Sequence, residues 1–393
     1  MTRQMKLGLP NNYVSRVMPP ATPHADGRLP GSGLVFTGRR RDPDLAAGAR
    51  SQRGAHAHGR PHRRGQHETR DMNPSSHLAV DPADLAAAGI TGVTSATNLA
   101  SAAGLAVAAG AASLAGLDAT LQAVGPALDH RWAIVGPPPS PDGWIRASDL
   151  LDPERLDEAL AVVREHHQAT PEVAVSYFTA WYAATIVGPA IATFVLTRRI
   201  PDLDPAEIWV HRHEGGWFDA TAFHRPRMTL LPEDPAVAGC APEATPVEVV
   251  AVAADLEALR AQLVEEIIGH LEPIIASLRK RARLGLAALW GAVAAQCGRT
   301  FLLTERVSRD PHLGRLEADA FFAAAAPTLR ARPTWQQFIH RGRCYTGMRR
   351  GSCCLAHRVT EEFCTACPFV AAPERESRLR EWIDSQGPGG LAV

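Results

Sequence analysis

The stretch GSCCLAHRVTEEFCTACP (residues 351–368) contains four of the chain's seven cysteines. They form an adjacent pair, a gap of nine residues and a Cys-x-x-Cys unit. The Cys-x-x-Cys spacing lets two thiolates reach one metal centre, and four thiolates are the ligand number of a structural zinc ion or a [2Fe-2S] cluster. A disulfide framework is typical of small secreted chains, and this chain has 393 residues. The stretch therefore predicts a metal centre on Cys353, Cys354, Cys364 and Cys367.

The adjacent pair bears on which metal is bound. Structural zinc sites are usually built from two separated Cys-x₂₋₄-Cys units. In a Cys-Cys pair the two side chains diverge unless the backbone turns sharply, and a two-iron cluster accepts ligands that are spread over two metal centres. The spacing favours a [2Fe-2S] cluster slightly, and a Cys₄ zinc site stays open as the alternative.

The same stretch resembles the C-terminal motif of the FhuF family of ferric-siderophore reductases. The resemblance includes the preceding Arg349-Arg350, the run Leu355–Arg358 after the pair, and Leu289-Trp290-Gly291 upstream. It spans roughly residues 147–369, and the central gap is one residue shorter than in the family pattern. The resemblance implies an enzyme of iron acquisition that reduces the Fe³⁺ of a siderophore chelate by one electron and releases Fe²⁺.

Basic residues near the cysteines are candidates for substrate binding. Many ferric chelates are anionic, so we expect the nearby cations to attract them and to tune the metal centre. An equally weighted interpretation is that these cations only neutralise thiolate charge. The candidates are Arg349, Arg350, His357 and Arg358, with Arg341 and Arg343 farther upstream.

The charge of the chain is unevenly distributed. Lys+Arg and Asp+Glu both total 41, but residues 1–71 hold 13 basic and 5 acidic residues, so a basic segment of +8 precedes an acidic remainder of −8. Residues 1–71 have almost no apolar run, which predicts a disordered tail. No apolar segment of a secretory signal follows the first residues, and we expect a cytoplasmic protein. A second start at Met72 would give a self-contained protein.

Apolar segments with helical spacing predict a mainly helical fold. Asp152 and Pro153 form a helix start, and Asp255 opens the longest periodic segment, which Pro273 is expected to break or kink. Residues 313–329 form another such segment. With one short hairpin, described next, these segments predict an α+β protein that is mainly α with a small antiparallel β-sheet.

Residues 173–197 are uncharged and apolar. Gly188-Pro189 interrupts them, which predicts two helices that meet at a kink. Their length also suits a membrane span, but no flanking loop has a clear positive bias, so we favour buried core helices. We therefore expect at most peripheral contact with a membrane.

The predicted hairpin joins residues 208–212 to residues 217–220 through Glu214-Gly215-Gly216. His211, His213 and His224 lie in or near it and are weaker candidates for metal ligands, because histidines on such strands are usually polar surface. Three further cysteines are left out of the ligand set: Cys240 and Cys297, expected to be small buried side chains, and Cys344, whose spacing does not fit.

The predicted organisation has four parts. These are the tail (residues 1–71), a mainly helical domain (72–335), a [2Fe-2S]-binding segment (336–372), and a short helix with a tail (373–393). No dinucleotide, Walker or nucleic-acid module is recognisable. We therefore expect a ferric siderophore and a separate electron donor (a ferredoxin or a flavin reductase) as partners, and no nucleic acid. Two alternatives stay open: an iron-sulfur redox or iron sensor, and a non-catalytic protein with structural zinc.

Overall fold

The structure is a computed structural model that describes residues 117–125, 132–237, 248–308, 310 and 312–385. All of these residues belong to one compact unit. The predicted disordered tail, the second start at Met72 and Cys240 lie outside the described residues.

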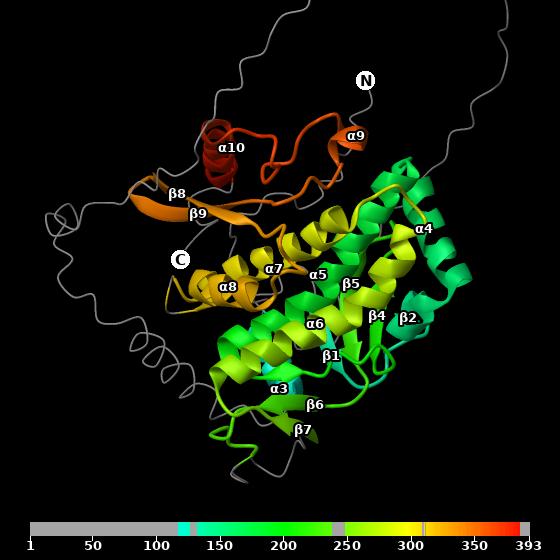
Figure 1. Ribbon diagram of the computed structural model, residues 1–393, viewed down its shortest axis with the longest axis vertical. Coiled ribbons are helices and arrows are strands. Elements are labelled where there is room, and N and C mark those ends of the chain that lie inside the picture. The colour runs from blue at the N-terminus through cyan, green and yellow to red at the C-terminus, as the bar shows by residue number, and fades with distance from the viewer. Residues whose placement is uncertain (1–116, 126–131, 238–247, 309, 311, 386–393) are drawn as a thin grey trace, which may run out of the picture. The chain divides into compact units, whose positions relative to one another are not determined.

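Helices dominate the described residues, as the sequence predicts (Figure 1). The helices are α3 (Leu117–Val124), the 3₁₀ helix η2 (Ala147–Leu151), α4 (Pro153–His167), α5 (Pro171–Thr197), α6 (Leu256–Arg279), α7 (Leu286–Val307), α8 (Leu313–Ala324), α9 (His357–Thr360) and α10 (Ala372–Ser385). The strands are β1 (Trp132–Val135), β2 (Trp144–Arg146), β3 (Ile200–Pro201), β4 (Ile208–Arg212), β5 (Phe218–Phe223), β6 (Arg227–Leu230), β7 (Glu248–Val252), β8 (Thr334–His340) and β9 (Arg343–Arg349). The α+β class is confirmed.

The predicted hairpin is present as β4 and β5, which pair antiparallel. The sheets are more extensive than one small antiparallel sheet, however. A four-stranded sheet has the order β1-β5-β4-β2, a three-stranded sheet the order β3-β6-β7, and β8 pairs with β9. The β1–β5 and β6–β7 pairs are parallel. β1 and β5 are far apart in sequence, which is why local patterns did not predict their pairing.

Helix α5 is the centre of the fold. It packs most extensively on α7 and also contacts α3, α4, α6, β3 and β5 (Figure 1). All of its residues are buried except Pro171, Glu172 and Leu196. A helix that is apolar on every side must be covered on every side, so the other elements are arranged around it.

The expectation of two helices at Gly188-Pro189 is wrong, because α5 runs through Pro189 without a break. Proline has no N–H, so the carbonyl of Thr185 loses its helical donor. The Thr221 hydroxyl, from β5, donates to that carbonyl at 2.8 Å. The strand therefore supplies the hydrogen bond that the helix lacks.

Pro273 likewise lies inside a continuous helix, α6, so the expected break does not occur. Gly269, four residues earlier, is exposed, and water can reach the carbonyl that Pro273 leaves without a donor. The predicted helix over residues 313–329 is shorter than expected, because α8 ends at Ala324, shortly before Pro327. The caps at Asp152 and Asp255 are as predicted.

Among the described residues, two helices are long and apolar enough to cross a membrane, namely α5 and most of α7. Their most apolar windows are 94% and 83% buried within the protein, respectively. Core helices of soluble proteins pass the same test, so length and composition are weak evidence for a membrane span.

His270 on α6 is buried, and both of its ring nitrogens have partners. Nδ1 lies 2.6 Å from the Leu203 carbonyl, and Nε2 lies 2.8 Å from the Tyr182 hydroxyl. The carbonyl can only accept, so Nδ1 carries the proton and Nε2 accepts from Tyr182. Burial lowers the pKa of His270 to about 4, against a smaller opposing effect of the Leu203 hydrogen bond and the Asp204 charge.

We predict that Thr221→Val lowers the free energy of unfolding by about 1–3 kcal/mol, because the buried Thr185 carbonyl loses its donor. Thr221→Ser keeps the hydroxyl and should cost about 0.8 kcal/mol for the lost methyl group. Urea unfolding of the three proteins tests this. A Val variant as stable as the Ser variant would contradict the account of Pro189.

We also predict that His270 makes the fold sensitive to acid. Between its unfolded pKa, about 6.5, and its folded pKa, about 4, only the unfolded state takes up the proton. The resulting loss of stability from pH 7 to pH 5 is about 2 kcal/mol. His270→Gln should be less stable at pH 7 but should lose less on acidification, as measured by urea unfolding at the two pH values. Equal pH slopes would refute the prediction.

Candidate metal centre

Strand β9 leads directly into the cysteine segment. The β8–β9 hairpin turns at Arg341 and Gly342, whose φ angles of 50° and 73° suit a tight two-residue turn. The sequence did not predict this hairpin. After β9, the backbone N–H of Arg350 donates to the Ala366 carbonyl at 2.8 Å, which joins the two halves of the segment. The adjacent pair and the Cys-x-x-Cys unit therefore lie side by side.

The four predicted ligands are brought together. The Sγ atoms of Cys354 and Cys364 are 3.9 Å apart, and the Cys367 thiol interacts with those of both Cys353 and Cys364. Two thiolates on one tetrahedral metal with bonds of about 2.3 Å would be about 3.8 Å apart. The spacing of Cys354 and Cys364 is thus close to that of two ligands of one metal ion.

The backbone turns sharply right after the adjacent pair, as such a pair requires. Leu355 has a φ of 61°, a conformation that residues other than glycine rarely adopt. Its N–H donates to Cys353 Sγ at 3.4 Å. Ala356 and Phe369 provide similar N–H donors to Cys354 and Cys367. N–H groups that point at sulfur stabilise thiolates and are a feature of iron–sulfur sites.

The four thiols of the segment differ in acidity. The hydrogen bond from Cys364 lowers the pKa of Cys354 to about 5, and the charge of Arg350 contributes. The hydrogen bond from Cys364 also lowers the pKa of Cys367, to about 6. Burial raises the pKa of Cys353 to about 11, and the proton shared with Cys354 raises that of Cys364. Metal ligands must be deprotonated, so the lowered pKa values of Cys354 and Cys367 favour metal binding.

The segment is anchored on α5 and α7. Ser176 on α5 donates to the Cys354 carbonyl at 2.9 Å. On α7, Gly291 lies so close to the segment that a Cβ atom there would be 2.7 Å from the Cβ atom of Ser352. Gly291 belongs to the Leu-Trp-Gly run that the sequence singled out, and its lack of a side chain is what lets the segment dock.

Arg375 on α10 is a functional candidate that the sequence did not reveal. It is 2% exposed and donates to the Val370 carbonyl at 2.5 Å, to the Cys367 carbonyl at 3.3 Å and to Gln336 Oε1 at 2.9 Å. It also interacts electrostatically with Cys364 and Cys367. A cation in the first turn of a helix is disfavoured by the helix dipole. An arginine at this position of the C-terminal helix was therefore a signal in the sequence that the residue has another role.

The predicted substrate-binding cations differ in position. Arg350 is 2% exposed, which favours charge balance of the thiolates over direct contact with a chelate. Arg349 is exposed and donates to the Pro368 carbonyl at 3.0 Å. Arg341 and Arg343 lie at the tip of the hairpin, separated from Arg349 by about 20 Å of strand, and Arg341 pairs with Asp384. The tip is therefore too distant to share a small ligand with the thiols.

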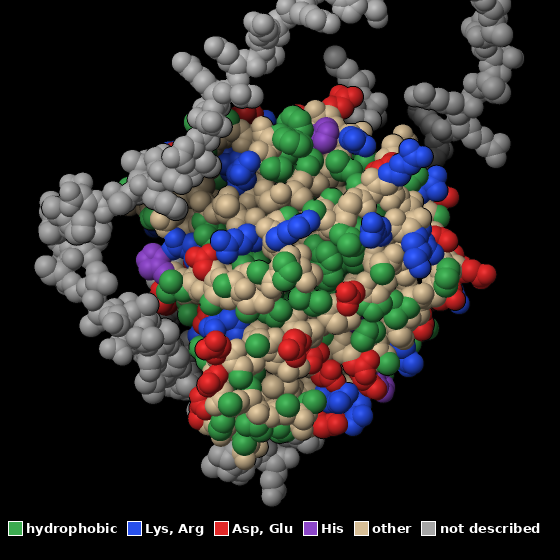
Figure 2. Space-filling view, viewed as in Figure 1, with side chains coloured by type: hydrophobic (Ala, Val, Ile, Leu, Met, Phe, Trp, Pro, Cys, Tyr) green, Lys and Arg blue, Asp and Glu red, His purple; other side chains and the backbone are tan. Residues whose placement is uncertain are grey.

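An exposed aromatic cluster flanks the thiols. His357 Nδ1 is 3.8 Å from Cys353 Sγ, and the His357 ring lies against Phe363, which contacts Phe369. Phe363 and Phe369 are 40% and 68% exposed. Figure 2 shows hydrophobic side chains beside a histidine over α9. Arg358, on the same short helix, is exposed and interacts with Glu172. This face of the segment is open to a ligand.

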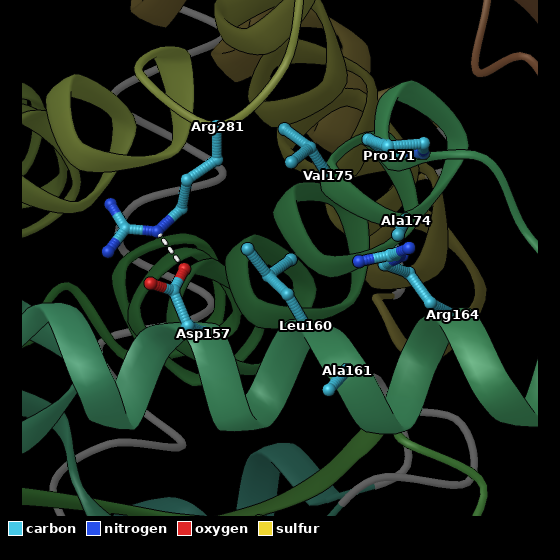
Figure 3. A pocket seen from close by; sticks show the side chains of 8 residues that line it. All are labelled: Asp157, Leu160, Ala161, Arg164, Pro171, Ala174, Val175 and Arg281. Atoms are coloured by element: carbon cyan, nitrogen blue, oxygen red, sulfur yellow. Dashed lines mark hydrogen bonds and ion pairs between the residues drawn. The ribbon is translucent and has the colours of Figure 1, made fainter.

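A separate cavity of about 220 Å³ lies among α4, α5 and Arg281. Figure 3 shows Arg281 and Asp157 pointing toward each other at one end and Arg164 at the other. Arg281 pairs with Asp157 at 2.5 Å and donates to the carbonyls of Ser277 and Pro153. Arg281, which belongs to the basic run RKRAR (residues 279–283), thus has a structural role, and no cysteine lines the cavity.

The other metal candidates stay apart from the thiols. His211 pairs with Asp219 at 2.7 Å, and the His213 ring stacks on Trp217. His224 is exposed. Cys297 is fully buried, as predicted, and Cys344 is exposed on β9.

The four thiols are chemically suitable ligands for a metal centre. Their arrangement, however, is not that of four ligands around a single metal ion. Over the described ranges, no three or more His, Cys, Asp or Glu side chains form a group that could hold a metal ion. A [2Fe-2S] cluster needs two ligands at each iron, and the Cys354–Cys364 pair has that spacing. The residues present would hold it through Cys353, Cys354, Cys364 and Cys367.

Comparison with known proteins adds no identification. No protein-family model matches the chain. No curated protein matches it significantly. The resemblance to the FhuF family therefore depends on the cysteine motif and the runs around it.

We predict that Gly291→Ala loosens the cysteine segment, because the new methyl group would lie 2.3 Å from Ser352 Oγ. Such overpacking costs about 1–3 kcal/mol, and the cysteines of the metal-free protein should react faster with a thiol reagent. The measurements are urea unfolding and the rate of thiol modification.

Gly269→Ala is the matched control. No atom lies within 4 Å of a Cβ at Gly269 on α6, and alanine is favoured over glycine in a helix by about 0.5–1 kcal/mol. The control should be at least as stable as wild type, with unchanged thiol reactivity. Equal behaviour of the two variants would show that the segment does not depend on Gly291.

Proposed function

We propose that the protein is a ferric-siderophore reductase with a [2Fe-2S] centre on Cys353, Cys354, Cys364 and Cys367. The observation that carries the proposal is the gathering of these four thiols on a partly exposed segment, two of them 3.9 Å apart, beside the buried Arg350. When bound, such a cluster would supply one electron to the ferric ion of a chelate. The electron itself would come from a separate donor.

The protein's own residues would set the charge and environment of the centre. Arg350 and Arg375 are both buried and interact electrostatically with the thiolates. Positive charge at this position favours the more negative, reduced state of a bound centre. The N–H groups of Leu355, Ala356 and Phe369 act in the same direction.

The chelate would approach from the side of the aromatic cluster. His357, Phe363 and Phe369 are the exposed or partly exposed side chains that flank the thiols there. Arg349 and Arg358 add positive charge to the same segment, which suits an anionic chelate. The substrate's ferric ion is held by hard oxygen ligands that suit Fe²⁺ less well, so its reduction releases it.

We predict that full-length protein purified without oxygen contains about two irons and two sulfides per chain. The chemically reduced protein should be reoxidised by ferric siderophores and should release Fe²⁺ to a ferrous-specific chelator. Cys353→Ser and Cys367→Ser should lower that rate more than about 100-fold, since even changes around metal ligands cost 10–100-fold. Cys344→Ser, at an exposed cysteine outside the proposed ligand set, is the control and should behave as wild type.

Each failure has a distinct meaning. One zinc per chain and no sulfide would replace the proposal with a structural Cys₄ zinc site. A full cluster that stays reduced with hydroxamate, catecholate and carboxylate chelates would rule out the reductase and favour a redox or iron sensor.

A further inference from the structure

Tyr177 places a hydroxyl group beside the cysteine segment in an unusual state. It follows Ser176, whose hydroxyl donates to the Cys354 carbonyl, and is 3% exposed. Within the part of the chain that the structure describes, its hydroxyl oxygen has no hydrogen-bond partner. Burial of an unsatisfied hydroxyl costs about 1–3 kcal/mol, so a phenylalanine would suit the packing better unless the hydroxyl has another use.

The cysteines of the segment influence the Tyr177 hydroxyl. Burial raises its pKa, and the charges of Cys354 and Cys364 raise it further. Its ring is held between other rings, with centroids 5.0 Å from Trp181 and 5.7 Å from His167. These ring contacts fix the position of the phenol, and the hydrogen bond from Ser176 to the Cys354 carbonyl holds this turn of α5 against the cysteine segment.

The second tyrosine of α5 provides a direct comparison. Tyr182 is equally buried, but its hydroxyl donates to His270 at 2.8 Å. Burial raises the pKa of Tyr182, without a contribution from a cysteine. One helix therefore carries a partnered tyrosine in the core and an unsatisfied one at the cysteine segment.

We propose that the Tyr177 hydroxyl donates a hydrogen bond to a sulfur of the bound [2Fe-2S] cluster, on the side of Cys354 and Cys364, and raises its reduction potential. This inference rests on the proposed function. The backbone N–H groups described above serve Cys353, Cys354 and Cys367, and Tyr177 would add a donor that also reaches the side of Cys364. A donor aimed at sulfur stabilises the reduced state more than the oxidised state, because reduction adds negative charge to the sulfurs. Tyr177 thus sets the reduction potential of the centre and takes no part in the electron transfer itself.

The test compares Tyr177→Phe with Tyr182→Phe in the full-length protein. Iron and sulfide are quantified first, and the midpoint potential is then measured by redox titration. Tyr177→Phe should keep the cluster and shift the potential to more negative values by at least 59 mV, a tenfold change in the ratio of reduced to oxidised protein. Its metal-free form should be as stable as wild type or more so, because it loses an unsatisfied group.

Tyr182→Phe should show the opposite pattern, with a lower free energy of unfolding and an unchanged potential. Replacing Tyr177 with 3,5-difluorotyrosine gives a second measurement, since its more acidic hydroxyl is a stronger donor and should raise the potential. If Tyr177→Phe fails to keep the cluster, the potential of the fluorinated protein tests the inference instead. An unchanged potential in Tyr177→Phe or in the fluorinated protein would overturn the inference and leave the reductase proposal standing. A wild-type protein without iron and sulfide would overturn both.

Discussion

The burial of α5 on every side is the constraint on which the rest of the structure depends. A helix of 27 residues with almost no exposed side chain must be enclosed by other elements, here the long helices α6 and α7 and the strand β5. Apart from the Tyr177 hydroxyl, its buried hydroxyl groups donate hydrogen bonds within the helix or to neighbours. Thr179 and Thr185 donate to carbonyls of the helix itself, and Thr221 supplies the donor that Pro189 lacks. The core is therefore built around the one element that could not remain exposed.

The candidate metal centre is an extension of that core. The start of α5 provides Ser176 and Tyr177, α7 provides the surface at Gly291, and α10 provides Arg375. These contacts come from segments almost 200 residues apart in the chain. They fix the cysteine segment from its buried side and leave the side with Phe363 and Phe369 exposed. The segment is thus supported by the core on one side and open to solvent on the other.

Charge is distributed around the thiols in two layers. Arg350 and Arg375 are buried and act on the sulfurs, whereas Arg349 and Arg358 are exposed and face solvent. Burial of Arg350 suits the interpretation of charge balance, and the exposed arginines remain the candidates for attracting an anionic chelate. Buried cations act strongly because the surrounding dielectric is low, and exposed cations act through a screened field on approaching molecules.

The sequence by itself determined the helical class, the caps at Asp152 and Asp255, the β4–β5 hairpin and the four cysteines that gather, because each depends on neighbouring residues or on ligand chemistry. Only the tertiary structure decided that α5 continues through Pro189, because the missing hydrogen bond is replaced from another strand. The same holds for the parallel strand pairs and for the roles of Tyr177 and Arg375. Thr221 and the partner strand of β1 lie far away along the chain from the groups that they bind, and the contacts of Arg375 with Cys367 and Val370 depend on how the cysteine segment folds. No local pattern specifies a contact that forms only when the core closes.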